Sequence, residues 1–246
     1  MIQFSDKAVR LLITVLMVLS IYQPINADAE VTPIEFGTLD FPPFSIVNDD
    51  QSVSGSKVEM IRKILNQAGI KFTERGYPST RLFKNLAKGT THVWMGTKGV
   101  PSYDDYVLYS DHMVDEIEVQ VYTRGDVPQP TSKEDLRGHH VLALKSYAYG
   151  GLIRYLRKPE NNITVNTIKS HEAAIKMLLS KRTDYLIVYR TPAEAAMKKL
   201  NVSNLKSTSL LNLQLYFIVS KRTPDAIKIL DKMEVSYKAL KENGDI

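Results

Sequence analysis

The chain has 246 residues, of which 32 are lysine or arginine and 27 are aspartate or glutamate, giving a net charge of +5 at pH 7. This small excess, without a clustered basic face, argues against a protein that binds nucleic acid. The chain contains no cysteine, which excludes disulfides, thiolate metal sites and a lipid-bearing cysteine.

The first 29 residues have the pattern of a cleavable secretory signal. Lys7 and Arg10 precede an unbroken apolar run over residues 11–21, and the Ala-Asp-Ala sequence at 27–29 has small residues at the two positions that a signal peptidase reads. The run is about half as long as a membrane-spanning helix, so a retained anchor is not expected. We therefore predict a signal peptide over residues 1–29 and a mature protein in the periplasm.

A strand, a proline-containing bend and a helix are predicted between residues 34 and 69. The proline pair in Phe41-Pro42-Pro43-Phe44 must end the strand, because proline donates no backbone N–H to a sheet. Ser56-Lys57-Val58-Glu59 has the pattern of a capping box and predicts the start of the helix. The rings of Phe41 and Phe44 are thus placed at the carboxyl end of a strand, where open α/β sheets usually bind ligands. Packing in the core is the alternative for both rings.

Three further side chains in the first half of the chain are candidate ligand contacts. Arg81 lies in the first turn of a second predicted helix, which Gly89 ends, and can form a surface salt bridge or contact an anion at the rim of a cleft. Trp94, the only tryptophan, lies near the carboxyl end of a buried strand and faces either the core or a cleft. Lys98 follows on a glycine-flanked loop, where its ammonium can contact a bound anion or remain solvated.

The strand and helix pattern is interrupted between residues 127 and 138 and then begins again. Residues 141–144 form a predicted strand that leads into Ser146 and Tyr147 at a helix start, where both side chains can hold ligand oxygens or simply cap the helix. Ser170 is predicted to cap a later helix, and Tyr189 follows a buried strand. Repeated β-then-α units with this restart predict an α/β protein with two lobes.

These landmarks in this order resemble the family 3 extracellular solute-binding proteins, the periplasmic partners of ABC importers for polar amino acids and related solutes. The resemblance covers residues 34–244. It rests on six short sequences: Phe41-Pro42-Pro43-Phe44, Gly55 before the helix, Leu86-Ala87-Lys88-Gly89, Tyr109-Ser110-Asp111, Leu136-Arg137-Gly138 and the segment 178–184.

The resemblance implies a type II periplasmic-binding-protein fold, in which each of two lobes is a sheet flanked by helices and two crossing strands form the hinge. Residues 30–122 would form the first part of lobe 1 and residues 123–209 would form lobe 2. Residues 210–246 would supply the return strand and C-terminal helix that complete lobe 1. The lobes of such proteins close on a small molecule, and the closed form docks on the membrane permease of an ABC importer. A monomer with no cofactor and no metal is expected.

The sequence departs from the amino-acid binders of this family at two positions. Those proteins hold the ligand α-carboxylate with an Arg in a Thr-Pro-x-Arg sequence, and the equivalent Val100-Pro101-Ser102-Tyr103 has Tyr103 there. They hold the α-ammonium with an Asp, and Tyr189 stands at that position. We therefore expect a small ligand, neutral or anionic, with a flat or apolar portion. The candidate ligand-binding residues are Phe41, Phe44, Arg81, Trp94, Lys98, Tyr103, Ser146, Tyr147 and Tyr189.

An enzyme is the main alternative, because the family's fold also includes a periplasmic dehydratase and occurs beside lytic domains of cell-wall enzymes. The sequence contains no Gly-x-Ser-x-Gly, no phosphate loop and no His-Glu-x-x-His. His139 and His140 would point to opposite faces of a strand, which makes a poor metal chelate. Glu59, Asp104 or Lys98 could perform acid–base chemistry in a closing cleft if its pKa were shifted. A sensor component that reports to a receptor is the third hypothesis.

Overall fold

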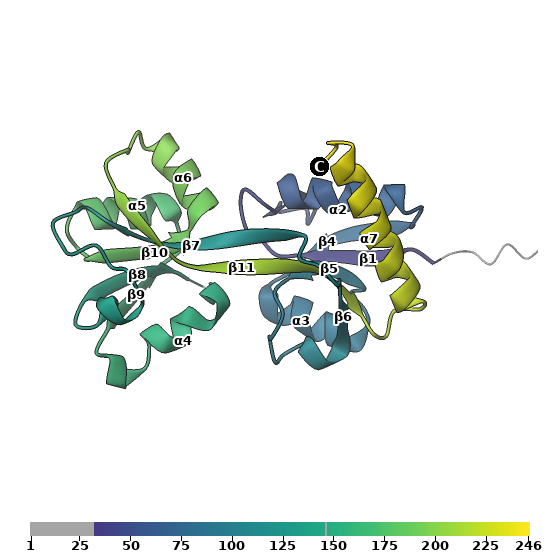
Figure 1. The fold of residues 1–246 in the computed structure, drawn as a ribbon, viewed down its shortest axis with the longest axis horizontal. Helices are drawn as coiled ribbons and strands as arrows, with labels where there is room; N and C mark the ends of the chain where they lie inside the picture. The colour runs from purple at the N-terminus through teal and green to yellow at the C-terminus, as the bar shows by residue number, and fades with distance from the viewer. Residues whose placement is uncertain (1–31, 146) are drawn as a thin grey trace, which may run out of the picture. The chain divides into compact units, whose positions relative to one another are not determined.

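The computed structural model describes residues 32–145 and 147–246 (Figure 1). The predicted signal peptide, residues 1–29, and the candidate Ser146 therefore lie outside the described residues. Among the helices that are described, none combines the length and the apolar character needed to cross a membrane.

The described residues form a nine-stranded sheet with the strand order β4-β1-β5-β11-β7-β10-β8-β9, in which β6 also pairs with β11. A separate two-stranded hairpin consists of β2 and β3. The strands are β1 (Ile34–Thr38), β2 (Ile46–Val47), β3 (Val53–Ser54), β4 (Phe72–Gly76), β5 (Val93–Gly96), β6 (Val107–Tyr109), β7 (Asp115–Thr123), β8 (His140–Leu144), β9 (Thr164–Ile168), β10 (Tyr185–Tyr189) and β11 (Lys206–Ser220).

The helices flank the two ends of this sheet (Figure 1). The described α-helices are α2 (Ser56–Gln67), α3 (Ser79–Lys88), α4 (Leu152–Leu156), α5 (His171–Leu179), α6 (Arg190–Lys199) and α7 (Ala226–Glu242). The short 3₁₀ helices are η1 (Asp104–Tyr106), η2 (Glu134–Leu136), η3 (Tyr149–Gly151) and η4 (Pro159–Asn161).

Two lobes follow from this arrangement, and the predicted α/β two-lobed fold is confirmed. The first lobe contains β1, β4, β5 and β6 with α2, α3 and α7, and the second contains β8, β9 and β10 with α4, α5 and α6 (Figure 1). β7 and β11 run antiparallel from one lobe to the other, from the pair Lys206 and Thr123 to the pair Leu215 and Asp115. These are the two predicted crossing strands.

The predicted lobe boundaries fall inside the crossing strands themselves. Residue 123 is the last residue of β7, and residue 210 lies at an irregularity of β11 between Ser209 and Leu211. The largest cluster of buried apolar side chains also runs through both lobes and includes Val119 and Val121 of β7. The division at residues 123 and 210 therefore stays a prediction.

The start of α2 differs from the predicted capping box. The residue before the helix is Gly55, and no side chain caps this end. The backbone N–H of Lys57 instead donates to the carbonyl oxygen of Phe44 at 2.9 Å, and Glu59 forms an ion pair with Arg62. The prediction was wrong because Ser56 is the first helical residue and not the cap. The N–H of Glu59, which the serine hydroxyl would have bound, donates to Gly55 O at 3.0 Å.

Two other helix ends agree with the sequence. α3 ends at Gly89, whose φ of 76° is left-handed, as the glycine signal predicted. α5 begins after Ser170, whose hydroxyl accepts a hydrogen bond from the N–H of Ala173 at 3.2 Å. At both ends the capping group is local in sequence, so the pattern was sufficient to find it.

Candidate functional site

The bend after β1 is closed by its own backbone hydrogen bonds. The N–H of Phe41 donates to Ser45 O at 2.7 Å, and the N–H groups of Phe44 and Ser45 donate to Phe41 O at 2.9 and 3.0 Å. The backbone of the bend also packs closely against Gly55. A Cβ at residue 55 would lie only 2.6 Å from Phe44 O, so only glycine leaves room for this contact. The rings of Phe41 and Phe44 are consequently held in one place at the carboxyl end of β1.

A cleft of about 1090 Å³ lies beside this bend, and residues of both lobes line it. The crossing strands contribute Ile117, Leu213 and Leu215. All the sequence-predicted site residues that are described line the cleft, namely Phe41, Phe44, Arg81, Trp94, Lys98, Tyr103, Tyr147 and Tyr189. Their contact with a ligand stays a prediction.

An aromatic cluster joins the two lobes inside the cleft. Its members are Phe41 and Phe44 of the first lobe and Tyr147 and Tyr189 of the second, and we call this set the aromatic cluster. The ring centroid of Phe41 lies 5.3 Å from that of Tyr147 and 4.9 Å from that of Tyr189. The two tyrosine rings lie 5.4 Å apart. Apolar or flat groups of a ligand entering here would meet ring faces and edges.

Both tyrosine hydroxyls of the aromatic cluster are neutral at pH 7. Burial raises the pKa of Tyr147 to about 12 and raises the pKa of Tyr189 well above its usual range. Neutral phenols can donate as well as accept hydrogen bonds. Tyr149 packs beneath them, 5.0 Å from the ring of Tyr189, and its hydroxyl accepts the backbone N–H of Leu144 at 2.9 Å.

A second group of rings forms the first-lobe side of the cleft. Trp94 lies 5.5 Å from both Phe83 and Tyr103, and Phe83 and Tyr103 lie 4.9 Å apart. Tyr103 is fully buried, its hydroxyl donates to Thr97 O at 2.7 Å, and burial raises its pKa well above the usual range. Tyr103 therefore packs beneath the surface of the cleft and carries no charge there.

The ammonium of Lys98 faces β11. Its Nζ atom lies 3.8 Å from the ring centroid of Tyr216 and 5.5 Å from that of Tyr109. It also donates to Ser110 O at 3.5 Å. A cation over two aromatic rings is attracted by their π faces, so in this arrangement Lys98 holds its loop against β11.

Lys57 is the one cation among the described lining residues that is not exposed, since its side chain is 12% exposed. Its Nζ forms an ion pair with Asp115 at the start of β7 and lies 4.6 Å from the ring centroid of Phe44. Burial lowers the pKa of the Lys57 ammonium, while the neighbouring carboxylate favours its charged form. This pair ties α2 to a crossing strand below the aromatic cluster.

The exposed rim of the cleft is mainly basic. Arg75, Arg81, Lys98 and Arg154 line it and are exposed, whereas the acidic lining residues are Asp40 and Asp49. Both acidic residues belong to the first lobe, so the described lining residues of the second lobe include no carboxylate. The rim therefore offers more contacts to an anion than to an ammonium group.

The described residues include no group of three or more His, Asp or Glu side chains that is arranged to hold a metal ion. His139 lies 3.4 Å from Asp184 instead, at the edge of the second lobe. The expected absence of a metal site stays a prediction for the whole chain.

The sequence model of the bacterial extracellular solute-binding proteins, family 3, matches residues 34–246. The chain belongs to this family. A search of curated protein sequences found no match.

Solved structures with the same fold include solute-binding proteins and a sensor domain. The substrate-binding protein of an amino acid ABC transporter has 19% identity and a TM-score of 0.63, with 87% of this chain and 95% of that chain covered. Holo ArgBP from T. maritima has 20% identity and a TM-score of 0.62, with 85% of this chain and 90% of that chain covered. A histidine kinase sensor domain similar to periplasmic binding proteins has 19% identity and a TM-score of 0.67, with 87% of this chain and 92% of that chain covered. At these identities the likeness establishes the fold alone.

This family 3 solute-binding protein has lining residues that sequence reasoning missed. Arg154 on α4, Lys57 on α2 and Leu213 on β11 all line the cleft, and Tyr149 supports its aromatic cluster. Arg154 and Leu213 lie in no recognisable motif, and Lys57 lies inside the predicted capping box, whose pattern does not indicate that its side chain lines a cleft. Each reaches the cleft only through the packing of its helix or strand. The one sequence feature that could have indicated this part of the cleft is the glycine pair at 150 and 151. Both residues have left-handed φ values, and both line the cleft.

Proposed function

We propose that this protein is a periplasmic solute-binding protein that closes its two lobes on a small ligand and presents it to the permease of an ABC importer. The ligand is neutral or anionic and has a flat or apolar portion. The aromatic cluster is the observation that carries this proposal, because Phe41 of the first lobe meets Tyr147 and Tyr189 of the second inside the cleft. A flat group packed against these rings would contact both lobes at once.

The geometry at Tyr103 and Tyr189 supports a ligand other than a standard α-amino acid. Tyr103 is buried and its hydroxyl is already bound to Thr97 O. Tyr189 is also buried and presents a neutral phenol. With no carboxylate among the described lining residues of the second lobe, an α-ammonium group would be desolvated there without a charged partner, which is costly.

Closure would proceed by rotation of the lobes about β7 and β11. In this proposal residues 123–209 move as one body, and residues 30–122 with 210–246 move as the other. The aromatic cluster links the bodies in the closed form, so ligand binding and closure are coupled. The protein acts as a monomer and leaves its ligand chemically unchanged.

A thermal-shift screen of the mature protein tests this proposal. The compounds are the standard amino acids, organic acids, aromatic acids, short peptides and sugars. A ligand at a hundred times its dissociation constant adds about 2.7 kcal/mol to the free energy of unfolding, which gives a clear rise in Tm. Because the only tryptophan of the chain, Trp94, lines the cleft, its fluorescence provides an independent binding curve.

The expected result is stabilisation by a compound that lacks an α-ammonium group. Stabilisation by a standard amino acid would overturn the ligand class. Recovery of the bound compound by NMR, unchanged after long incubation, would agree with a binding protein, whereas turnover would establish an enzyme. Size-exclusion chromatography with light scattering measures the oligomeric state.

A sensor component is the second candidate, and the fold shared with a histidine kinase sensor domain favours it. In that case the closed form would dock on a receptor instead of a permease. Uptake of the labelled ligand in cells with and without the gene separates the two. Loss of uptake supports transport, while normal uptake with loss of a ligand-induced transcriptional response supports sensing.

A further inference from the structure

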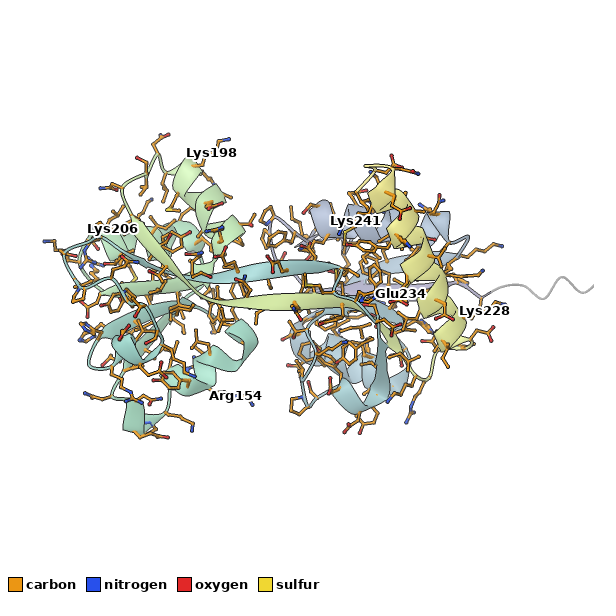
Figure 2. All side chains as sticks on the ribbon, viewed as in Figure 1. Arg154, Lys198, Lys206, Lys228, Glu234 and Lys241 are labelled. Carbon is orange, nitrogen blue, oxygen red and sulfur yellow. The ribbon has the colours of Figure 1, made fainter. Side chains whose placement is uncertain are left out.

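Two arginines from opposite lobes line the same cleft. Arg81 lies in the first turn of α3 in the first lobe, and Arg154 lies on α4 in the second. Figure 2 shows the Arg154 side chain extending from the lower edge of α4. Both side chains are exposed, so neither guanidinium is held in place by burial.

Among the residues that the structure describes, these two arginines differ from the other basic lining residues in having no partner. Lys57 forms an ion pair with Asp115, and Lys98 lies over the ring of Tyr216. Arg75 donates to Gln51 Oε1 at 3.2 Å. Within residues 32–145 and 147–246, the side chains of Arg81 and Arg154 form no ion pair, side-chain hydrogen bond or ring contact.

In the described part of the chain, neither of the acidic lining residues, Asp40 and Asp49, forms an ion pair with these arginines. The carboxylate of Asp40 accepts the backbone N–H of Val47 at 3.2 Å, within the first lobe. Gly151 leaves the Arg154 guanidinium space at the second-lobe edge, because a Cβ there would lie 3.1 Å from Arg154 Nη2. The two guanidiniums thus present ten N–H donors in all, at five per side chain, to a cleft whose described second-lobe lining has no carboxylate.

We infer that Arg81 and Arg154 hold a single anionic group of the ligand between the two lobes. This inference rests on the proposed function and deepens it, since it selects an anion over a neutral compound. The ligand class is a small organic carboxylate, or another oxyanion, whose flat or apolar portion lies on the aromatic cluster. Planar guanidiniums suit this task because each can bind an oxyanion with two parallel hydrogen bonds.

The same arrangement explains how the anion promotes closure. Two cations that approach across a cleft repel each other, and an anion between them converts the repulsion into two attractions. A neutral ligand of the same shape leaves the repulsion in place. The charge of the ligand would therefore decide whether the lobes close, while the aromatic cluster decides its shape.

Matched pairs of compounds test the inference by thermal shift and Trp94 fluorescence. The probes are benzoate with benzamide, phenylacetate with phenylacetamide, and 4-hydroxybenzoate with 4-hydroxybenzamide. The variants are Arg81→Gln, Arg154→Gln and the double variant. The controls are Lys84→Gln on α3 and Arg157→Gln at the end of α4, which are exposed cations outside the cleft lining. Sodium sulfate against sodium chloride at equal ionic strength is a further probe that needs no organic ligand.

We expect an acid to stabilise the wild-type protein more than its amide does. Each single arginine variant should weaken binding of that acid at least tenfold, and the two controls should leave it within twofold. If no organic pair binds, sulfate should still stabilise the wild-type protein more than the double variant. Equal effects of acid and amide, or of sulfate on wild type and double variant, would overturn the inference.

Failure of the inference is distinguishable from failure of the proposed function. If a neutral compound binds equally well to the wild type and to both arginine variants, the inferred anion contact of Arg81 and Arg154 is wrong. The protein would still be a solute-binding protein. If a standard amino acid binds and its binding requires both arginines, the inferred anion contact stands and the proposed ligand class is overturned.

Discussion

The ring of Phe41 in the first lobe lies against the ring of Tyr189 in the second, with centroids 4.9 Å apart and planes at 75°. The same ring meets Tyr147 edge to face at 5.3 Å. Aromatic pairs of this geometry contribute about 0.5–1.5 kcal/mol each beyond the burial of their area. One side chain of the first lobe therefore stabilises the approach of the second lobe through two contacts.

Substitution of Phe41 by alanine should favour the open arrangement of the lobes. Loss of two ring contacts removes about 1–3 kcal/mol of interaction between the lobes, which shifts their equilibrium by about fivefold or more. We expect a larger radius of gyration for the unliganded variant in X-ray scattering and weaker binding of any aromatic ligand in Trp94 fluorescence. Tyr106→Ala, which removes an exposed ring outside the cleft lining, is the control. An unchanged radius of gyration would show that the ring contacts do not hold the lobes together.

Gly55→Ala should displace the bend that carries Phe41 and Phe44. Gly55 has a φ of 114° and a ψ of 162°, a conformation that is almost restricted to glycine. An added Cβ would also lie 2.6 Å from Phe44 O and 2.9 Å from Pro43 O, both of which are backbone atoms that cannot rotate away. We expect a loss of about 2–4 kcal/mol in unfolding free energy by urea denaturation, with weakened ligand binding.

Gly138→Ala provides the matched control for this substitution. Gly138 also has a left-handed φ, 79°, but an added Cβ there meets no atom within 4 Å. Its cost should be about 1 kcal/mol, which is the backbone contribution alone. Equal losses for the two variants would mean that contact with the bend adds nothing at residue 55.

Lys98→Met should lower stability without abolishing ligand binding. The ammonium lies 3.8 Å from the ring centroid of Tyr216, and an exposed cation–π contact contributes about 0.5–1 kcal/mol. Urea denaturation should show a loss of that size, and the dissociation constant of a ligand should change less than threefold. Lys84→Met, an exposed residue of α3, is the control for loss of charge. A tenfold loss of binding would instead support the anion contact that the sequence suggested for Lys98.

Local signals predicted the helix ends that depend only on nearby residues. Gly89 and Ser170 terminate their helices as expected, because a left-handed glycine and an N-cap hydroxyl act within one turn. The start of α2 was mispredicted because Ser56 is already inside the helix, and the N–H of Glu59 donates to Gly55 O. The N–H of Lys57 donates to Phe44 O, a contact with the bend that the local pattern does not contain.

The same distinction applies to the candidate site. Phe41, Tyr147 and Tyr189 were predictable because each lies at or just beyond the carboxyl end of a strand, and such ends converge in an α/β sheet. Lys98 was harder, since the ring beside its ammonium belongs to Tyr216 on β11, far along the chain. Arg154 lies in no motif, and its relation to the cleft depends on how α4 is packed.

Glu172→Gln should destabilise the second lobe in a pH-dependent way. Glu172 lies in the first turn of α5, where a hydrogen bond from its own backbone N–H, the Ser170 hydroxyl at 2.9 Å and the Lys199 ammonium at 3.1 Å lower its pKa to about 2. A lowered pKa means that the folded protein favours the charged carboxylate, so the stabilisation is present above the unfolded pKa, near 4.5. It is then lost as the pH falls toward 2.

We therefore expect the wild-type protein to exceed the variant in unfolding free energy by about 1 kcal/mol at pH 7, a modest value because solvent screens this partly exposed group. The difference should be constant from pH 7 to about 4.5 and should disappear near pH 2 in urea denaturation. Glu116→Gln, at an exposed carboxylate on β7, is the matched control for the loss of one negative charge. A difference that persists at pH 2 would mean that the substitution acts through packing, because the charge of Glu172 would then be irrelevant.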